Sequence, residues 1–410
     1  MLAGILFGGI CNFLQLATSS FTNLIETFLF FGLFDVLGKI FIASLKLLVV
    51  PLVFISLTCG VAGLGGKSNL GTMSLKTIGL YLMTTALAIT LALSVSIFVK
   101  PGEDASLSLD GDQHEEYQVN ESPSFVDIIV NIFRSNPIEA MAQGNMLQII
   151  VIAVLLGVAI SKTKEEGKRV MSFLKAMNEL MMQILFLLMR LAPYGIFCLL
   201  ALNFYVEGFN LLLQLFSYFA TVISVLIIHC FLIYSLLLVF FTGLNPITFM
   251  SHLRHVWIFG FATASSNATI PITLETLHKM GIKKSIASFT VPLGATLNMD
   301  GTAIMQGVAT VFIAQVYQID LSIIDYLTVV MMATLASIGT AGVPGVGLIT
   351  LAMVLQQVGL PVEGIALIIG VDRLLDMLRT SVNLTGDTLV SCIIANNNGD
   401  IDHNRFVKKI

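Results

Sequence analysis

Charged residues are scarce in this sequence, and their scarcity excludes an ordinary soluble protein. Lys, Arg, Asp and Glu make up 11% of the 410 residues, whereas 56% are hydrophobic. Long apolar runs recur from end to end, which predicts a polytopic membrane protein embedded in a lipid bilayer. The formal net charge is −4, so nothing in the composition indicates a nucleic-acid partner.

Cysteine and histidine are too scattered to form a disulfide or metal framework. The five cysteines lie in apolar segments and form no CxxC pair, which is typical of small core residues. His252 and His255 lie three apart, but no carboxylate or cysteine stands near them. No nucleophile–base pair or cofactor motif stands out, so we expect neither an enzyme nor a cofactor.

One stretch near the carboxyl end, at 371–387, is unusually polar for such a chain. On a helix of about 100° per residue, its polar side chains share an arc of roughly 100°. A charge at the centre of a membrane helix costs about 2.5 kcal/mol or more, so such side chains face protein or a wet cavity. We interpret the stripe as the wall of a solute and ion site. Its members are Asp372, Asp376, Arg379, Thr380, Asn383 and Asp387.

A simpler interpretation is an ion pair between Asp376 and Arg379 that only joins helices. Asn383 and Asp387 extend the same stripe without needing a partner, which favours a binding site.

Apolar runs and charged loops predict the order of the spans. The basic loop at 161–169 indicates a cytoplasmic position, and so does the tail with Arg405, Lys408 and Lys409. The loop at 101–124 holds seven acids and no Lys or Arg, so we expect it outside. Residues 19–36 are mixed and are expected at the outer face. The first six spans are predicted at about 1–18, 37–62, 75–99, 124–161, 171–200 and 210–242.

Two later segments are too polar at their centres to cross the bilayer as single helices. Residues 247–280 carry the tip TASSNATIP, and residues 322–357 carry the tip SIGTAGVPG. Irregular backbone at membrane depth survives where it lines a cavity or is buried in protein, which predicts re-entrant hairpins. The span at 283–318 is interrupted at GATLNMDGT (294–302), and a last helix covers about 361–395.

The hairpins are expected to enter from opposite sides, which makes an inverted repeat with its site near the membrane midplane. The predicted fold is all-α, with eight transmembrane helices plus two re-entrant helical hairpins.

NMDGT at 298–302, SIGTAGVPG at 337–345, the serine-rich first tip and the DxxxDxxRTxxN…D stripe occur together. With this set the chain resembles the dicarboxylate/amino acid:cation symporters, most of all the bacterial and archaeal sodium-coupled glutamate/aspartate transporters. The similarity is strongest over 247–390 and extends more weakly over nearly the whole chain.

The resemblance implies a multi-pass homotrimer in the inner (plasma) membrane with a cytoplasmic C-terminus. It also implies an elevator mechanism, in which a transport domain slides past a scaffold and the outer hairpin is the gate. The implied scaffold is 1–70 and 101–205, the transport domain is 71–100 and 206–400, and the cytoplasmic tail is 401–410.

The resemblance also assigns residue roles. Arg379 would hold the side-chain carboxylate of an acidic amino acid, because a guanidinium binds carboxylate in bidentate fashion. Asp376 would take the ammonium group, with Thr302, Thr380 and Asn383 beside it. The α-carboxylate would be held by Ser265, Ser266, Gly342 and Val343.

Sodium would be co-transported at three sets of oxygen donors, which suit a hard cation. One set is Gly294, Asn298, Asn383 and Asp387; another is Tyr81, Thr84, Thr85, Asn298 and Asp300; a third is Thr296, Ser337, Ile338 and Thr340.

Many relatives place a second arginine near the site, at positions that here are Ala264 and Met377, and Asn267 is less usual than serine. Two other substrate classes stay open within the family. Proton-coupled C4-dicarboxylate carriers usually lack the acids equivalent to Asp376 and Asp387, and neutral amino acid carriers replace the arginine equivalent to Arg379. A channel or receptor of the same fold is a further alternative.

Overall fold

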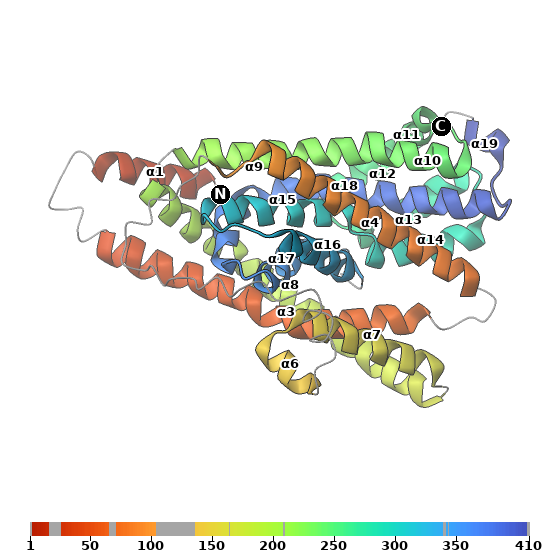
Figure 1. Ribbon diagram of the computed structural model, residues 1–410, viewed down its shortest axis with the longest axis horizontal. Coiled ribbons are helices and arrows are strands. Elements are labelled where there is room, and N and C mark those ends of the chain that lie inside the picture. The colour runs from red at the N-terminus through yellow and green to blue at the C-terminus, as the bar shows by residue number, and fades with distance from the viewer. Residues whose placement is uncertain are drawn as a thin grey trace.

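The computed structural model is built almost entirely of helices (Figure 1). Among the residues that it describes there is no strand, only an isolated antiparallel bridge between Ile282 and Ile401. The predicted all-α class is therefore confirmed. The described residues are 2–15, 26–64, 71–103, 136–163, 165–207, 210–338, 342 and 344–407. The predicted acidic loop lies outside them from residue 104 onwards.

One group of helices packs around the long helix α8 (Glu165–Glu207). Helix α3 (Asp35–Leu64) lies against both α8 and α7 (Met146–Lys162), and α1 (Leu2–Gln15) also lies against α8. Helix α8 runs beyond both ends of the span predicted at 171–200.

The start of α3 corrects a predicted boundary. A π-helical stretch, η1 (Glu26–Phe34), leads directly into α3, so the candidate span begins at Glu26 and not at residue 37. The sequence ETFLFFGLF is apolar and aromatic, and the ring of Phe30 stacks on that of Tyr205 in α8 at 3.9 Å between centroids. Residues 26–36 are thus helical and continuous with α3, whereas their position at the outer face stays a prediction.

A second group packs around α15 (Asp300–Val316), in which every residue except Gln315 is buried. Helices α4 (Gly71–Val99), α9 (Asn210–Ile227) and α18 (Ile365–Asn397) all lie against it. A helix that is buried on all sides carries the core of the fold.

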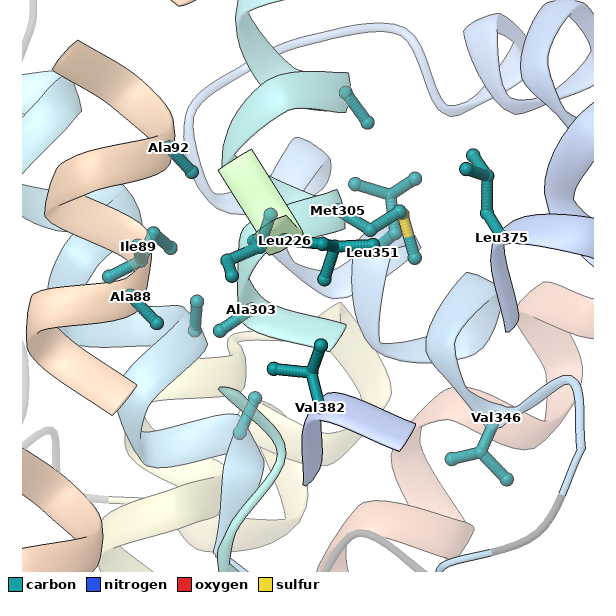
Figure 2. Close-up of a cluster of buried hydrophobic side chains, with 14 of the residues drawn as sticks. Ala88, Ile89, Ala92, Leu226, Ala303, Met305, Val346, Leu351, Leu375 and Val382 are labelled. Carbon is teal, nitrogen blue, oxygen red and sulfur yellow. The ribbon is translucent and has the colours of Figure 1, made fainter. Parts of the chain in front are cut away.

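Small side chains let α4 approach α15 closely. Figure 2 shows Ala88, Ile89 and Ala92 of α4 directed toward the buried core that includes Ala303. A Cβ atom added to Gly307 would lie 3.0 Å from the Cβ of Ala92. This close approach brings the polar face of α4 against the start of α15.

The predicted interruption at 294–302 is confirmed. Helix α14 (Lys284–Leu297) ends at Asn298, whose backbone is extended, and α15 begins at Asp300. Pro292 and Gly294 precede the break and weaken helical continuation. The two half-helices meet in the interior, where Asn298 and Asp300 are both fully buried.

Two helix–turn–helix pairs correspond to the predicted hairpins. In the first, α12 (Arg254–Thr263) and α13 (Ser266–Lys279) are joined by Ala264, at a left-handed φ of +49°, and Ser265. In the second, α16 (Ile323–Ser337) precedes α17 (Val346–Gln357). Their entry from opposite membrane faces stays a prediction.

Four helical stretches in the described part of the chain are long and apolar enough to cross a bilayer alone. Shorter apolar helices accompany them, so the predicted total of eight spans stays a prediction. The four stretches are Glu26–Ala62, Leu75–Val99, Glu165–Leu188 and Leu215–Thr242. The remaining elements are α6 (Pro137–Gln143), η2 (Ile228–Ile233), α10 (Tyr234–Thr242), α11 (Pro246–His252), η3 (Val362–Gly364) and α19 (His403–Val407).

Candidate functional site

A carboxylate–guanidinium cluster, made of Asp372, Asp376 and Arg379, lies on α18. Arg379 is only 1% exposed, and its Nη1 donates to Asp372 Oδ1 at 2.7 Å while its Nη2 donates to Asp376 Oδ1 at 2.8 Å. All three residues lie on one helix, so the pair does not join helices. Both ion pairs therefore lie within α18, and the interpretation of the stripe as a binding site stays a prediction.

The cluster carries an excess of negative charge. Two carboxylates face one guanidinium, and Arg373, the other base nearby, is largely exposed with its Nη1 3.9 Å from Asp376 Oδ2. The Nε of Arg379 is buried without a hydrogen-bond partner in the described structure. An unused donor on a buried charged group is available to a ligand acceptor, which makes Arg379 a candidate binding residue.

The two hairpin tips contact each other next to this cluster. Ser265 Oγ donates to the Gly342 carbonyl at 2.8 Å, and the Asn267 backbone N–H donates to the same oxygen at 3.1 Å. The backbone N–H of Gly345 donates to Asp376 Oδ2 at 3.2 Å, which ties the second tip to α18. The tips therefore close over the stripe.

A small cavity of about 20 Å³ lies between the tips, the helix break and α18. This volume holds about one water molecule, so a larger solute fits only if the tips separate. Most of its lining was expected from the sequence, including Ala264 in the first tip; Met299, Val346 and Gly347 were not. The predicted substrate residues in its wall are Ser266, Thr302, Gly342, Asp376, Thr380 and Asn383.

Arg379 and Ser265 contact this wall rather than form it. Arg379 Nη2 would lie 3.2 Å from a Cβ atom added to Gly347, so the guanidinium packs directly under the start of α17. Val343 lies outside the described residues.

A second cluster, which we call the cation cluster, begins at Asn298 in the helix break. The Asn298 side chain donates to Asp387 Oδ1 and to the Asn383 carbonyl, both at 2.9 Å. A Cβ atom added to Gly294 would lie 2.3 Å from Asp387 Oδ1, so only glycine fits there. The structure thus brings together all four members of the first predicted sodium set: Gly294, Asn298, Asn383 and Asp387.

Asp300 extends the cation cluster toward α4. Its Oδ1 accepts a hydrogen bond from Thr85 Oγ1 at 2.5 Å, and Thr84 Oγ1 donates to Asn298 Oδ1 at 3.4 Å. The Tyr81 hydroxyl instead donates to the Thr290 carbonyl at 3.0 Å. The second predicted set therefore assembles around Thr84, Thr85 and Asp300, with Tyr81 directed at a neighbouring carbonyl.

The cation cluster contains two fully buried carboxylates, Asp300 and Asp387, and neither forms an ion pair with Lys or Arg in the described residues. Asp387 Oδ2 has no hydrogen-bond partner there either. Buried carboxylates are expensive unless a cation or proton compensates them. Carboxylate, amide and hydroxyl oxygens are the donors that a hard monovalent or divalent cation requires.

The third predicted set is not brought together in the same way. Thr296 Oγ1 donates to the Leu293 carbonyl at 2.9 Å, and Ser337 Oγ donates to the Thr334 carbonyl at 2.7 Å, each within its own helix. Thr340 lies outside the described residues. This set stays a prediction that depends on the second tip.

Sequence reasoning missed three contributors to these clusters. Asp372 was placed on the stripe but not recognised as a partner of Arg379. The Tyr234 hydroxyl donates to Asp300 Oδ2 at 2.7 Å, and His229 Nε2 lies 3.6 Å from the same oxygen. Both residues come from an apolar run in η2 and α10, where nothing in the sequence distinguishes them from packing residues.

Comparison with known proteins identifies the family of this chain. Residues 1–397 match the model of the sodium:dicarboxylate symporter family. The chain is 32% identical over 364 residues to the proton/sodium-glutamate symport protein of Bacillus subtilis, covering 88% of this chain and 85% of that protein. It is 32% identical over 371 residues to the proton/glutamate-aspartate symporter of Escherichia coli, covering 87% and 84%.

A third relative is named for a different substrate. The C4-dicarboxylate transport protein of Rhodospirillum rubrum is 32% identical over 375 residues, which is 90% of this chain and 84% of that protein. Together the helical fold and the buried site define a membrane transporter. The chain belongs to the sodium:dicarboxylate symporter family.

Proposed function

We propose that the protein is a secondary active symporter that takes up L-aspartate and L-glutamate together with sodium. The observation that carries this proposal is the position of Asn383 between the two clusters. Its side chain lines the small cavity and accepts from the Gly301 N–H at 2.7 Å, while its carbonyl accepts from Asn298. Substrate and cation sites therefore share one residue.

The charges of the carboxylate–guanidinium cluster and of the cation cluster explain why binding of an acidic amino acid needs a cation. Arg379 offers a bidentate partner for the side-chain carboxylate, and Asp376 offers an acceptor for the ammonium group. The carboxylate–guanidinium cluster is already negative, and an acidic amino acid adds a further negative charge. Sodium at Asp300 and Asp387 offsets this charge, so binding of the two solutes is mutually favourable.

An elevator mechanism is part of the same proposal. The helices around α15 hold both clusters, whereas the helices around α8 contribute neither, which supports a division into a moving and a fixed part. The hydrogen bonds from the second tip to α18 and to the first tip are the contacts that break when the gate opens. We also propose the homotrimer and the cytoplasmic C-terminus on family resemblance.

The decisive experiment is uptake of labelled L-aspartate in proteoliposomes. We expect accumulation against a gradient when sodium is high outside, and little uptake when potassium replaces sodium. Uptake that is indifferent to sodium would reject the coupling, and equilibration without accumulation would indicate a channel.

A proton-coupled C4-dicarboxylate carrier is a second candidate, because a relative of equal similarity carries that name. Asp376 argues against it, since a dicarboxylate has no ammonium group to pair with that carboxylate. Succinate that competes as well as aspartate, with uptake driven by a proton gradient alone, would favour this candidate. A neutral amino acid carrier is disfavoured because Arg379 would then lack a carboxylate to bind.

A further inference from the structure

Two hollows lie side by side on the outside of the α15 group, separated by the rings of Phe231 and Trp257. These rings pack edge to face, with 5.8 Å between their centroids. Both residues line both hollows, which have volumes of about 520 Å³ and 470 Å³. A molecule that crosses this aromatic pair contacts both hollows at once.

The larger hollow is apolar and has no free polar group to hold a solute. One wall is a face of α9 and η2 that includes Ile223, Leu226 and Ile227. The opposite wall is α12, and its indole N–H is satisfied because Trp257 Nε1 donates to Thr385 Oγ1 at 2.8 Å. Such a lining stabilises a hydrocarbon chain and no charged or hydrogen-bonding ligand.

The surface around the larger hollow is also apolar. Ile258 is 68% exposed, Leu232 53% and Phe231 51%. In a chain that spans the membrane, an apolar surface of this kind lies against lipid acyl chains. The hollow is therefore accessible from the bilayer core.

The smaller hollow differs because it contains a base. Arg254 and the hydroxyl-bearing Ser235 and Ser251 line it, together with Pro246 and Ile247 just beyond the end of the candidate span at Thr242. Arg254 is exposed and forms no ion pair in the described structure. An unpaired guanidinium at the level where a span ends matches the depth of a phospholipid headgroup.

We propose that one anionic phospholipid binds here. Its phosphate pairs with Arg254 in the smaller hollow, and one acyl chain crosses Phe231 and Trp257 into the larger hollow. Arg254 complements the charge of a phosphate, and Phe231 and Trp257 line both hollows. Both features favour a lipid over a protein segment as the occupant. Because the larger hollow is also walled by Leu378 and Val382 of α18, the lipid contacts the helix that carries Arg379, on a neighbouring face.

The chain offers an internal probe, because Trp257 is its single tryptophan. The purified protein is reconstituted with phospholipids whose acyl chains carry bromine, which quenches a tryptophan in contact. Quenching by brominated phosphatidylglycerol and phosphatidylcholine, each titrated against the unlabelled lipid, gives their relative affinities. We expect about fivefold preference for phosphatidylglycerol, because one arginine near the headgroup contributes about 1 kcal/mol.

Arg254→Gln is expected to bring the two affinities close to equal. The matched control Arg169→Gln removes the same charge from an exposed position on α8 and should keep the preference. Ile223→Phe fills part of the larger hollow and should reduce quenching by both lipids without changing their ratio. An unchanged emission maximum and melting temperature show that each variant is folded.

Three outcomes would overturn the proposal. Equal quenching by both lipids in the unmodified protein would indicate annular lipid only. A preference that survives Arg254→Gln would remove the arginine from the site. No quenching by either lipid would show that protein, and not lipid, covers this face.

Discussion

The carboxylate–guanidinium cluster and the cation cluster are assembled in different ways. Asp372, Asp376 and Arg379 all project from α18, whereas the cation cluster joins α4, the break between α14 and α15, and α18. A cluster on one helix keeps its geometry wherever that helix moves. A cluster spread over several elements exists only while they stay docked, so it can respond to the state of the tips.

This contrast gives the two clusters different expected sensitivities. Changes in the carboxylate–guanidinium cluster should alter which solute is bound, and changes in the cation cluster should alter how strongly solute binding depends on sodium. Asn383 lines the small cavity and also contacts Asn298 of the cation cluster. Its substitution should therefore alter solute choice and sodium dependence together.

The largest effect is expected from Arg379→Cys. Loss of the guanidinium removes the partner of the substrate carboxylate, worth about 3 kcal/mol, so aspartate uptake should fall about 100-fold. Serine or alanine uptake should appear in its place, measured with labelled amino acids in proteoliposomes. Arg373→Cys is the matched control on the same helix. Because the Arg373 side chain is exposed, this substitution should change aspartate uptake by no more than about threefold. Unaltered acidic selectivity in Arg379→Cys would contradict the assignment.

Asp387→Asn should weaken sodium binding with little change in substrate choice. The substitution keeps the shape of the side chain but removes a buried charge whose Oδ2 has no partner in the described structure. We expect the sodium concentration for half-maximal aspartate binding to rise about tenfold or more, since one lost charge contact costs about 1.5 kcal/mol. Thermal stabilisation by sodium and aspartate together measures it. Asp320→Asn, at an exposed position, should leave the sodium dependence unchanged.

Asn383→Ala should reduce the apparent affinities for aspartate and for sodium together. It removes the side-chain oxygen that accepts from the Gly301 N–H, next to the Asn383 backbone carbonyl to which Asn298 donates. A double-mutant cycle with Asn298→Ala, read by sodium-dependent aspartate binding, should give a coupling of about 1 kcal/mol or more. Additive effects in that cycle would mean that the two clusters act independently.

Ser265→Ala should have the smallest effect. The hydroxyl caps α13 at the Ala268 N–H and donates to Gly342, so its loss costs about 1 kcal/mol and weakens aspartate binding about fivefold. Isothermal titration in saturating sodium is the measurement. Ser224→Ala, an exposed serine of α9, serves as the control and should bind as the parent protein does. Equal affinities of parent and Ser265→Ala would exclude the tip contact as part of the bound state.

The local features of this chain were readable in its sequence. Polar residues or glycine interrupt apolar runs at Asn298, Ser265 and Gly342, and each proved to lie at a helix break or tip. The span boundary at Glu26 was missed because Glu26 and Asp35 flank a run of aromatic residues whose packing against Tyr205 is not visible in one dimension. Tyr234 was missed because a buried tyrosine in an apolar run usually serves packing.

The sequence by itself determined the helical class, the polar stripe of α18, the break before Asp300 and the positions of the two tips. Each is a local pattern, set by a helical period of about 3.6 residues or by residues that interrupt it. Only the tertiary structure decided that Asn298 reaches Asp387, and that Arg254 adjoins an apolar hollow. Local periodicity fixes the helix face on which each of these residues lies. It does not fix which residue of another helix that face contacts.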